Sequence, residues 1–176
     1  MPGLFLLEST FFGDSRGFFM ETYHAKAYES ILGQTQFVQD NLSLSHKGVV
    51  RGLHFQAPPH AQGKLVSVLR GKVLDVVVDI RVGSPTYGKH ACIELSEENH
   101  RQLFVAAGFA HGFTTLEDHT LFYYKCTNFY YKPSEGCLLW NDPDLGINWG
   151  IADPIISEKD KVGTRLKNLD SPYIFA

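Results

Sequence analysis

The chain has 176 residues, 44% of them apolar and 20% charged, which is the composition of an ordinary globular protein. Its net charge of −3, without a run of lysines and arginines, gives no reason to expect a nucleic-acid partner. No apolar run approaches the roughly 20 residues that a membrane-spanning helix needs, so we expect no membrane partner.

The first ten residues lack the basic start of a signal peptide. Cys92, Cys126 and Cys137 are odd in number and lack the spacing of metal ligands, so they resemble free thiols of a reducing compartment. We therefore expect a cytoplasmic protein. The chain shows no linker, repeat or low-complexity segment, and this predicts one domain over residues 1–176.

The N-terminal part, residues 4–23, is apolar and aromatic, and residues 13–17 (GDSRG) interrupt it with turn chemistry. This pattern predicts two strands joined by a turn. Residues 24–32 are helix formers, and Gly33 follows as a stop, so a short helix is predicted there.

From Phe37 onward, the pattern is one of short strands with turns every eight to twelve residues. In residues 73–81, Leu74, Val76, Val78 and Ile80 alternate with Asp75, Val77, Asp79 and Arg81, which is the period of a strand. Further strands are predicted at residues 64–69, 90–95, 102–105, 112–116 and 120–129. A helix is predicted at residues 157–169. Regular short strands favour an antiparallel sandwich or barrel, whose mouth can bind a small ligand.

Residues 51–56 (RGLHFQ) place a cation, a glycine and a histidine in one strand. Strict alternation puts Arg51, Leu53 and Phe55 on one face and His54 and Gln56 on the other. An imidazole suits proton abstraction near neutral pH. Taken alone, however, a strand histidine is more often a hydrogen-bonded structural residue.

Lys64 begins the next strand and shares a face with Val66 and Val68. A lysine on an apolar face needs a partner to offset its desolvation. It could hold the oxygen of a developing enolate, which is electrostatic catalysis. The alternative is a lysine at the strand end that reaches solvent.

Two further candidates come from aromatic strands. His111 lies between small and aromatic residues, and Tyr124 lies in the run 123–125 (YYK). A tyrosine hydroxyl can return a proton, and aromatic rings can stack on a base or sugar. For any one tyrosine, core packing is the plainer interpretation.

Residues 157–160 (SEKD) match the Ser-x-x-acid pattern of a helix N-terminus. Asp160 is therefore expected to be the N3 partner of a capping Ser157. The alternative is that its carboxylate hydrogen-bonds a catalytic imidazole and favours the charged form.

His54 and His111 on a small barrel also raise the question of a metal site. The segment after His54 has neither a second histidine two residues on nor a nearby glutamate, and His60 follows two prolines. Three or four convergent ligands do not emerge from this spacing. We expect no metal.

Nine motifs in order resemble the dTDP-4-dehydrorhamnose 3,5-epimerase family, and the resemblance extends over about residues 4–160. Each motif is weak alone, but nine in order with family-like spacing are specific. They are residues 13–19 (GDSRGFF), 38–41 (VQDN), 51–56 (RGLHFQ), 62–66 (QGKLV), 84–88 (SPTYG), 108–113 (GFAHGF), 124–127 (YKCT), 140–143 (WNDP) and 157–160 (SEKD).

The resemblance implies a mainly β, cupin-like jelly-roll barrel with short flanking helices, which forms a homodimer and needs no metal or organic cofactor. It implies epimerisation at C3 and C5 of dTDP-4-dehydro-6-deoxy-D-glucose, giving dTDP-4-dehydro-L-rhamnose. His54 is then the base, Asp160 its partner and Tyr124 the acid, with Lys64 near the ketone oxygen. The implied substrate-binding residues are Arg16 and Glu21 from the partner subunit, and Gln39, Asn41, Arg51, His111, Glu135 and Lys159.

The chemistry is consistent with these residue types. A proton beside a ketone is acidified by enolate formation, so one base and one acid on opposite faces of the sugar suffice. Arginines such as Arg51 and Arg16 can bind a diphosphate through forked, charge-assisted hydrogen bonds.

Two departures from the family pattern concern fine specificity. Ala106 and Ala107 stand where the family often has a proline, and the tail after Asp160 matches poorly. Three alternatives therefore stay open: a 3-epimerase on a related sugar nucleotide, a non-catalytic cupin that binds a sugar nucleotide, and a metal-dependent cupin oxygenase. The missing metal ligands disfavour the last.

Overall fold

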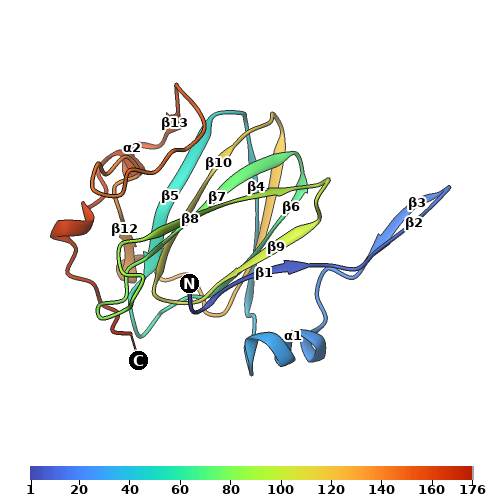
Figure 1. Cartoon of the computed structure of the whole chain (residues 1–176), viewed down its shortest axis with the longest axis horizontal. Helices are drawn as coiled ribbons and strands as arrows, with labels where there is room; N and C mark the ends of the chain where they lie inside the picture. The colour runs from blue at the N-terminus through green and yellow to red at the C-terminus, as the bar shows by residue number, and fades with distance from the viewer. Residues whose placement is uncertain (176) are drawn as a thin grey trace.

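Two antiparallel sheets face each other in the structure, a computed structural model that describes residues 1–175 (Figure 1). One sheet has the order β1 (Leu4–Glu8), β9 (Arg101–Val105), β6 (Lys64–Arg70), β11 (Thr120–Cys126) and β4 (Gln39–Ser45). The other has the order β12 (Glu135–Cys137), β5 (Val49–Gln56), β10 (Phe109–Thr115), β7 (Lys72–Asp79) and β8 (His90–Ser96), with β13 (Ile155–Ile156) parallel to β5. The prediction of a mainly β, antiparallel jelly-roll barrel is confirmed.

Alternation along β7 shows how the sequence divides the core. Val77 joins a cluster between the sheets, together with Val66 of β6 and Phe122 of β11. Val76 and Val78 join a second cluster on the outer face, which the C-terminal segments cover with side chains such as Trp149. Because β7 is buried on both faces, it is apolar on both, apart from its aspartates. The predicted alternation in this strand is confirmed.

The first helix, α1 (Ala25–Leu32), begins within one residue of the predicted start at residue 24 and ends at the predicted residue, Leu32. His24 is its N-cap and accepts a hydrogen bond from the Ala27 amide, and Gly33 ends it with a φ of +66°. The long helix predicted for residues 157–169 is wrong. Only α2 (Glu158–Lys161) and the 3-10 turn η2 (Leu166–Asn168) form there.

The helix ends early because the chain after it pairs with residues at the end of β12. The Thr164 amide donates to the Cys137 carbonyl at 2.9 Å, and a Cβ on Gly163 would lie 2.6 Å from the Leu138 backbone. The chain leaves the helix because it pairs with this strand. The strand predicted for residues 120–129 likewise ends at Cys126, and a loop leads from it to the 3-10 turn η1 (Lys132–Ser134).

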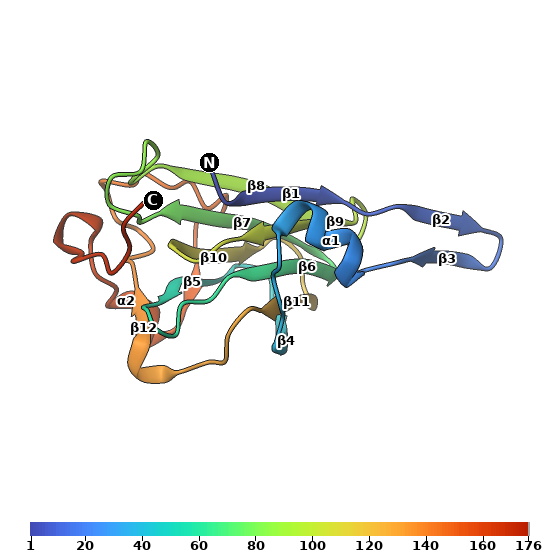
Figure 2. The ribbon, with the colours of Figure 1, turned by 90° about the horizontal axis from the view of Figure 1, so that it is seen from below.

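A two-stranded hairpin, β2 (Phe11–Asp14) and β3 (Gly17–Met20), projects away from the barrel (Figure 2). The predicted turn at residues 13–17 lies at its tip. Its aromatic rings are exposed: Phe12 by 61%, Phe18 by 62% and Phe19 by 70%. This exposure leaves the hairpin with an apolar surface that the barrel of its own chain does not cover.

The segment after Asp160, which matched the family poorly, packs back onto the barrel. The Tyr173 hydroxyl donates to the Gln56 carbonyl at the end of β5. Arg81 lies over the rings of Phe109 and Phe175, 4.2 and 5.0 Å from their centroids. Among the described residues, 1–175, no helix is both long and apolar enough to cross a membrane.

Candidate active site

The site is built around an irregularity in β5. His54 lies opposite His111 of β10, whereas Arg51 lies opposite Phe113. Arg51 and His54 are three positions apart on β5, but their partners on β10 are only two positions apart. β5 therefore carries one extra residue, which is a β-bulge. Arg51 and His54 consequently line the same cavity. The prediction that they face opposite sides, which assumed strict alternation, is wrong for Arg51.

Glycine is required at the bulge. Gly52 has a φ of +123°, and a Cβ on it would lie 2.6 Å from Gly112 Cα and 2.8 Å from the His111 carbonyl oxygen. A side chain here would be strained and would also collide with backbone atoms. The Gly52 amide points toward the Asp160 carboxylate, with 3.4 Å between its nitrogen and Oδ2.

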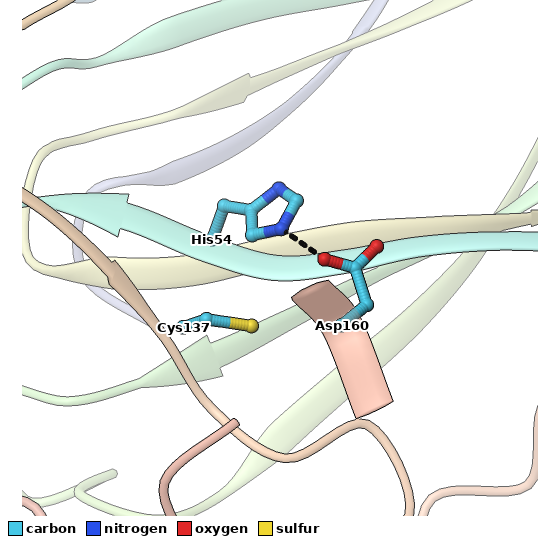
Figure 3. Close-up of side chains that lie close together, drawn as sticks. All are labelled: His54, Cys137 and Asp160. Atoms are coloured by element: carbon cyan, nitrogen blue, oxygen red, sulfur yellow. Dashed lines mark hydrogen bonds and ion pairs between the residues drawn. The ribbon is translucent and has the colours of Figure 1, made fainter. Parts of the chain in front are cut away.

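The central pair of the site joins residues that are far apart in the sequence. His54 Nε2 lies 2.6 Å from Asp160 Oδ1, and Figure 3 shows this hydrogen bond between β5 and α2. The His54 side chain is 27% exposed toward the cavity, and Asp160 is 5% exposed. Burial acts to raise the pKa of Asp160, but the hydrogen bond and charge of His54 outweigh it, so the pKa lies below its usual value. Asp160 is therefore a carboxylate that can stabilise an imidazolium.

Ser157 holds Asp160 in place. The Ser157 hydroxyl accepts a hydrogen bond from the Asp160 amide at 3.2 Å, so the predicted cap of the helix is confirmed. The Asp160 side chain is directed to His54 instead of back to the cap. Both roles considered for Asp160 are therefore present: its main-chain amide binds the capping Ser157, and its carboxylate binds His54.

Lys64 and Tyr124 face His54 from the opposite sheet, on β6 and β11. Burial lowers the pKa of Lys64 and raises the pKa of Tyr124. Lys64 Nζ lies 6.0 Å from the centre of the Tyr124 ring. The tyrosine stays protonated at neutral pH, so it can act as a proton donor.

These side chains surround a cavity of about 350 Å³. Arg51 and His111 line it, and the Nε of Arg51 donates to Ser45 Oγ at 3.1 Å. His111 Nε2 lies 2.9 Å from both carboxylate oxygens of the fully buried Asp75. The predicted residues that line this cavity are His54, Asp160, Tyr124, Lys64, Arg51, His111, Glu135 and Lys159.

A second hollow of about 230 Å³ adjoins the first, and His54, Lys64, Tyr124 and Glu135 line both. The predicted Gln39 and Asn41 lie here, joined by a hydrogen bond of 3.0 Å from Gln39 Nε2.

Glu135, which lines both hollows, pairs with Lys159, which lines the first. Burial acts to raise the pKa of Glu135, but hydrogen bonds from Lys159 and Tyr130 hold it below its usual value.

Arg16 and Glu21 lie outside both hollows. Arg16 is at the tip of the projecting hairpin, where it pairs with Asp14 at 2.5 Å, and Glu21 follows β3. Within one chain, the fold therefore does not bring these two predicted residues to the others.

One group of described side chains has the spacing of metal ligands: His54, Cys137 and Asp160, whose ligand atoms lie within 4.8 Å of one another (Figure 3). Burial and the charge of Asp160 raise the pKa of the Cys137 thiol to about 12. Without a metal, this thiol is protonated at neutral pH, so a metal ion would have to displace its proton as well as break the hydrogen bond between His54 Nε2 and Asp160. The donor set therefore fits a metal poorly.

Several residues of the site were not singled out from the sequence. Asp75 is a carboxylate in the middle of a valine-rich strand, and that contrast was the available signal. Tyr130 and Gln62 line the second hollow. They lie in or next to loops, where no periodic pattern marks them.

Comparison with known proteins gives consistent results. The family model described as dTDP-4-dehydrorhamnose 3,5-epimerase matches residues 1–168. A dTDP-4-dehydrorhamnose 3,5-epimerase from Shigella flexneri is 48% identical over 171 residues, which are 97% of this chain and 94% of the relative.

Solved structures are similar as well. A dTDP-6-deoxy-D-glucose-3,5-epimerase from Legionella pneumophila, in complex with dTDP-4-keto-L-rhamnose, superimposes with a TM-score of 0.96 at 46% identity, covering 100% of this chain and 95% of the other. ChmJ, a 3'-monoepimerase from Streptomyces bikiniensis in complex with dTDP-quinovose, is more distant. Its TM-score is 0.89 at 32% identity, and the match covers 94% of this chain and 84% of ChmJ.

Proposed function

The chain belongs to the dTDP-4-dehydrorhamnose 3,5-epimerase family, and we propose that it is an isomerase that converts dTDP-4-dehydro-6-deoxy-D-glucose into dTDP-4-dehydro-L-rhamnose. The observation that carries this proposal is the buried His54–Asp160 pair, which faces Lys64 and Tyr124 across one cavity. The whole chain acts as a single epimerase domain in this proposal.

Proton removal is the task of His54. Its free ring nitrogen takes the proton from the sugar carbon beside the C4 ketone, and the imidazole becomes an imidazolium. The Asp160 carboxylate at 2.6 Å stabilises this positive charge. Lys64 lies on the facing sheet, where its ammonium group can stabilise the enolate oxygen that forms at C4.

Reprotonation comes from the other face. Tyr124 is on β11 of one sheet and His54 is on β5 of the other, so a sugar between the sheets has one of them on each side. The Tyr124 hydroxyl donates its proton to the carbon, and the configuration there is inverted. The His54 imidazolium then loses its proton to solvent, and the Tyr124 phenolate takes one up from solvent, before the next turnover.

The diphosphate of the substrate is bound by the Arg51 guanidinium, which lines the cavity. His111 lines the same cavity, and the hydrogen bond with Asp75 orients its ring. Forked, charge-assisted hydrogen bonds from an arginine are well suited to phosphate oxygens. We assign Glu135 and Lys159 to further substrate contacts in the same cavity, and Gln39 and Asn41 to contacts in the adjoining hollow.

A homodimer completes this site. The hairpin that carries Arg16 extends away from its own barrel, and Phe12, Phe18 and Phe19 expose a large part of their rings on it. Leu42 and Leu44 of β4 also expose more than half of their surface. Burying these surfaces against a second copy would place Arg16 and Glu21 beside the partner's cavity, as the family resemblance implies.

We further propose a cytoplasmic location, supported by the three free cysteines. Inversion at C3 alone is the second candidate activity. The likeness to ChmJ, a 3'-monoepimerase, favours it as the alternative. Both candidates use the same base and the same acid, and they differ in the number of carbons inverted.

The experiment that tests the function is replacement of the base. His54→Ala should lower kcat by about 10³-fold, within the range that general bases contribute, while binding of dTDP and the melting temperature stay close to wild type. His90→Ala, on β8 and away from the cavity, is the matched control and should keep its turnover. Near-normal turnover of His54→Ala would remove His54 from its role.

A further inference from the structure

A loop beside the second hollow is held by glutamine side chains. Residues 128–131 follow β11 and lie outside any helix or strand. The side chains of Gln39, Gln56 and Gln62 bind the main chain of this loop, and we call these three residues the glutamine clamp. Gln62 Nε2 donates to the Asn128 carbonyl at 2.7 Å, and Gln39 Oε1 accepts from the Tyr130 amide at 2.8 Å.

Gln56 is the centre of the clamp. Its Nε2 donates to the Phe129 carbonyl at 3.2 Å and to the His60 carbonyl at 2.7 Å, and its Oε1 accepts from the Tyr131 amide at 2.7 Å. The side chain is 5% exposed. One buried amide thus binds the main chain immediately before and immediately after Tyr130, and it ties the loop to the segment that follows β5.

The residue held in this way faces the substrate cavity. Tyr130 lines the second hollow together with His54, Lys64 and Tyr124. Its hydroxyl donates to Glu135 Oε2 at 3.0 Å, and Glu135 pairs with Lys159, the neighbour of Asp160. The Tyr130 ring is 52% exposed, so its contacts with other side chains do not by themselves fix its position.

The hydrogen bonds from glutamine side chains to the loop main chain therefore fix the position of Tyr130. A loop outside regular structure loses conformational entropy when it is ordered, and buried side-chain amides that bind its main chain lower that cost on binding. Every residue from 128 to 131 has one main-chain group bound by the clamp. Replacing Gln56 would release the groups on both sides of Tyr130 at once.

We propose that Gln56 is a positioning residue of the epimerase site, which sets the Tyr130 side chain against the bound nucleotide sugar through the main chain of residues 129 and 131. The choice of ligand rests on the function proposed above. The claim that Gln56 orders the loop does not depend on that function, because the loop is ordered in the chain without substrate. Gln56 acts through Tyr130, so its removal should weaken substrate binding more than it slows the chemical step.

The kinetic test compares Gln56→Leu with wild type on dTDP-4-dehydro-6-deoxy-D-glucose. We expect KM to rise about tenfold, which corresponds to the loss of one or two hydrogen bonds, and kcat to change by less than about twofold. In the Tyr130→Ala background, the same substitution should change KM by less than about twofold, because its target is gone. An equal effect in both backgrounds would overturn the proposal.

A matched control separates positioning from stability. Gln102 is also a buried glutamine, 3% exposed, whose amide binds the Thr22 carbonyl and Ser67 Oγ on β6, outside both hollows. Gln102→Leu should lower the melting temperature as Gln56→Leu does and leave KM unchanged. If both variants lose stability and neither changes KM, Gln56 is structural only.

Hydrogen–deuterium exchange of the protein without substrate tests, independently of turnover, whether Gln56 orders the loop. A peptide that covers residues 127–134 should exchange faster in Gln56→Leu than in wild type, and unchanged exchange would overturn the proposal. Gln62→Leu, at the edge of the clamp, should give a smaller increase and serves if Gln56→Leu does not fold. If wild type does not turn over the sugar nucleotide, the proposed function fails, and the exchange measurement still decides whether the clamp orders the loop.

Discussion

Arg51 and His54 lie three positions apart on one strand and nevertheless line the same cavity. Strict alternation would place them on opposite faces of the sheet. The extra residue in β5 turns the chain between them, and Gly52 provides the backbone conformation that this requires. The bulge therefore brings Arg51, which we propose binds the diphosphate, and His54, the proposed base, to one side of the sheet.

Gly52→Ala should destabilise the protein. Its Cβ would meet Gly112 Cα at 2.6 Å, in a backbone conformation that side chains rarely adopt. Together, strain and overpacking should lower the free energy of unfolding by about 2 to 4 kcal/mol. Gly83→Ala is the control, because Gly83 also has a positive φ but a Cβ on it would have no neighbour within 4 Å, so it should lose only about 1 kcal/mol. Urea denaturation measures both, and equal losses would show that the close approach at Gly52 is unimportant.

Asp160→Asn should slow the reaction without loss of the fold. The amide has the same shape but carries no charge to stabilise the His54 imidazolium, so kcat should fall by about a hundredfold or more. Glu158→Gln on the same short helix has an exposed side chain and should retain its activity. Steady-state kinetics on both variants gives the comparison, and wild-type kcat in Asp160→Asn would mean that the pair is not part of the mechanism.

Tyr124→Phe should separate the two proton transfers. The phenyl ring keeps the shape of the cavity but has no proton to donate, so return of the proton on that face is lost. In deuterated water, exchange at the sugar carbon through His54 should continue while epimerisation falls. Proton NMR follows both processes in one sample. If exchange falls as much as epimerisation, Tyr124 is not the acid alone.

Asp79 should make stability depend on pH in acid. Its buried carboxylate accepts hydrogen bonds from Arg81, Ser84 and Thr86. Burial acts to raise the pKa of Asp79, but these hydrogen bonds outweigh it and hold the pKa far below its usual value. A lowered folded-state pKa gives stability that is complete above the ordinary value, about 3.9, and is lost as pH falls through the folded-state pKa.

The measurement for Asp79 is the difference in unfolding free energy between wild type and Asp79→Asn. It should be about 3 kcal/mol at pH 7, which is the low end for breaking a buried ion pair. The difference should shrink between pH 4 and pH 2. A difference that stays constant over that range would show that the Asp79 charge contributes nothing.

The strands and the first helix could be predicted because their signals are local. Period two in residues 73–81 and the helix formers that end at Gly33 are properties of neighbouring residues. The helix expected for residues 157–169 failed because Thr164 pairs with Cys137, a tertiary contact that overrides local propensity. The bulge at Gly52 was missed because a glycine in a strand has several structural explanations.

The prediction of the site residues depended more on the family resemblance than on the spacing of residues in the sequence. His54 and Asp160 are separated by 106 positions, and no spacing rule connects them. The family motifs suggested the pair, and the fold brings it together. All three glutamines of the clamp lie in family motifs, but the motifs did not suggest the clamp, because the three side chains act on the main chain of a loop.

The central claim is that one base inverts carbons on either side of the ketone. Incubation of wild type with dTDP-4-dehydro-6-deoxy-D-glucose in deuterated water, followed by NMR at C3 and C5, tests it most directly. We predict deuterium at both carbons and an L-configured product. Deuterium at C3 alone would establish the single-centre epimerase instead, and deuterium at neither carbon would contradict the account.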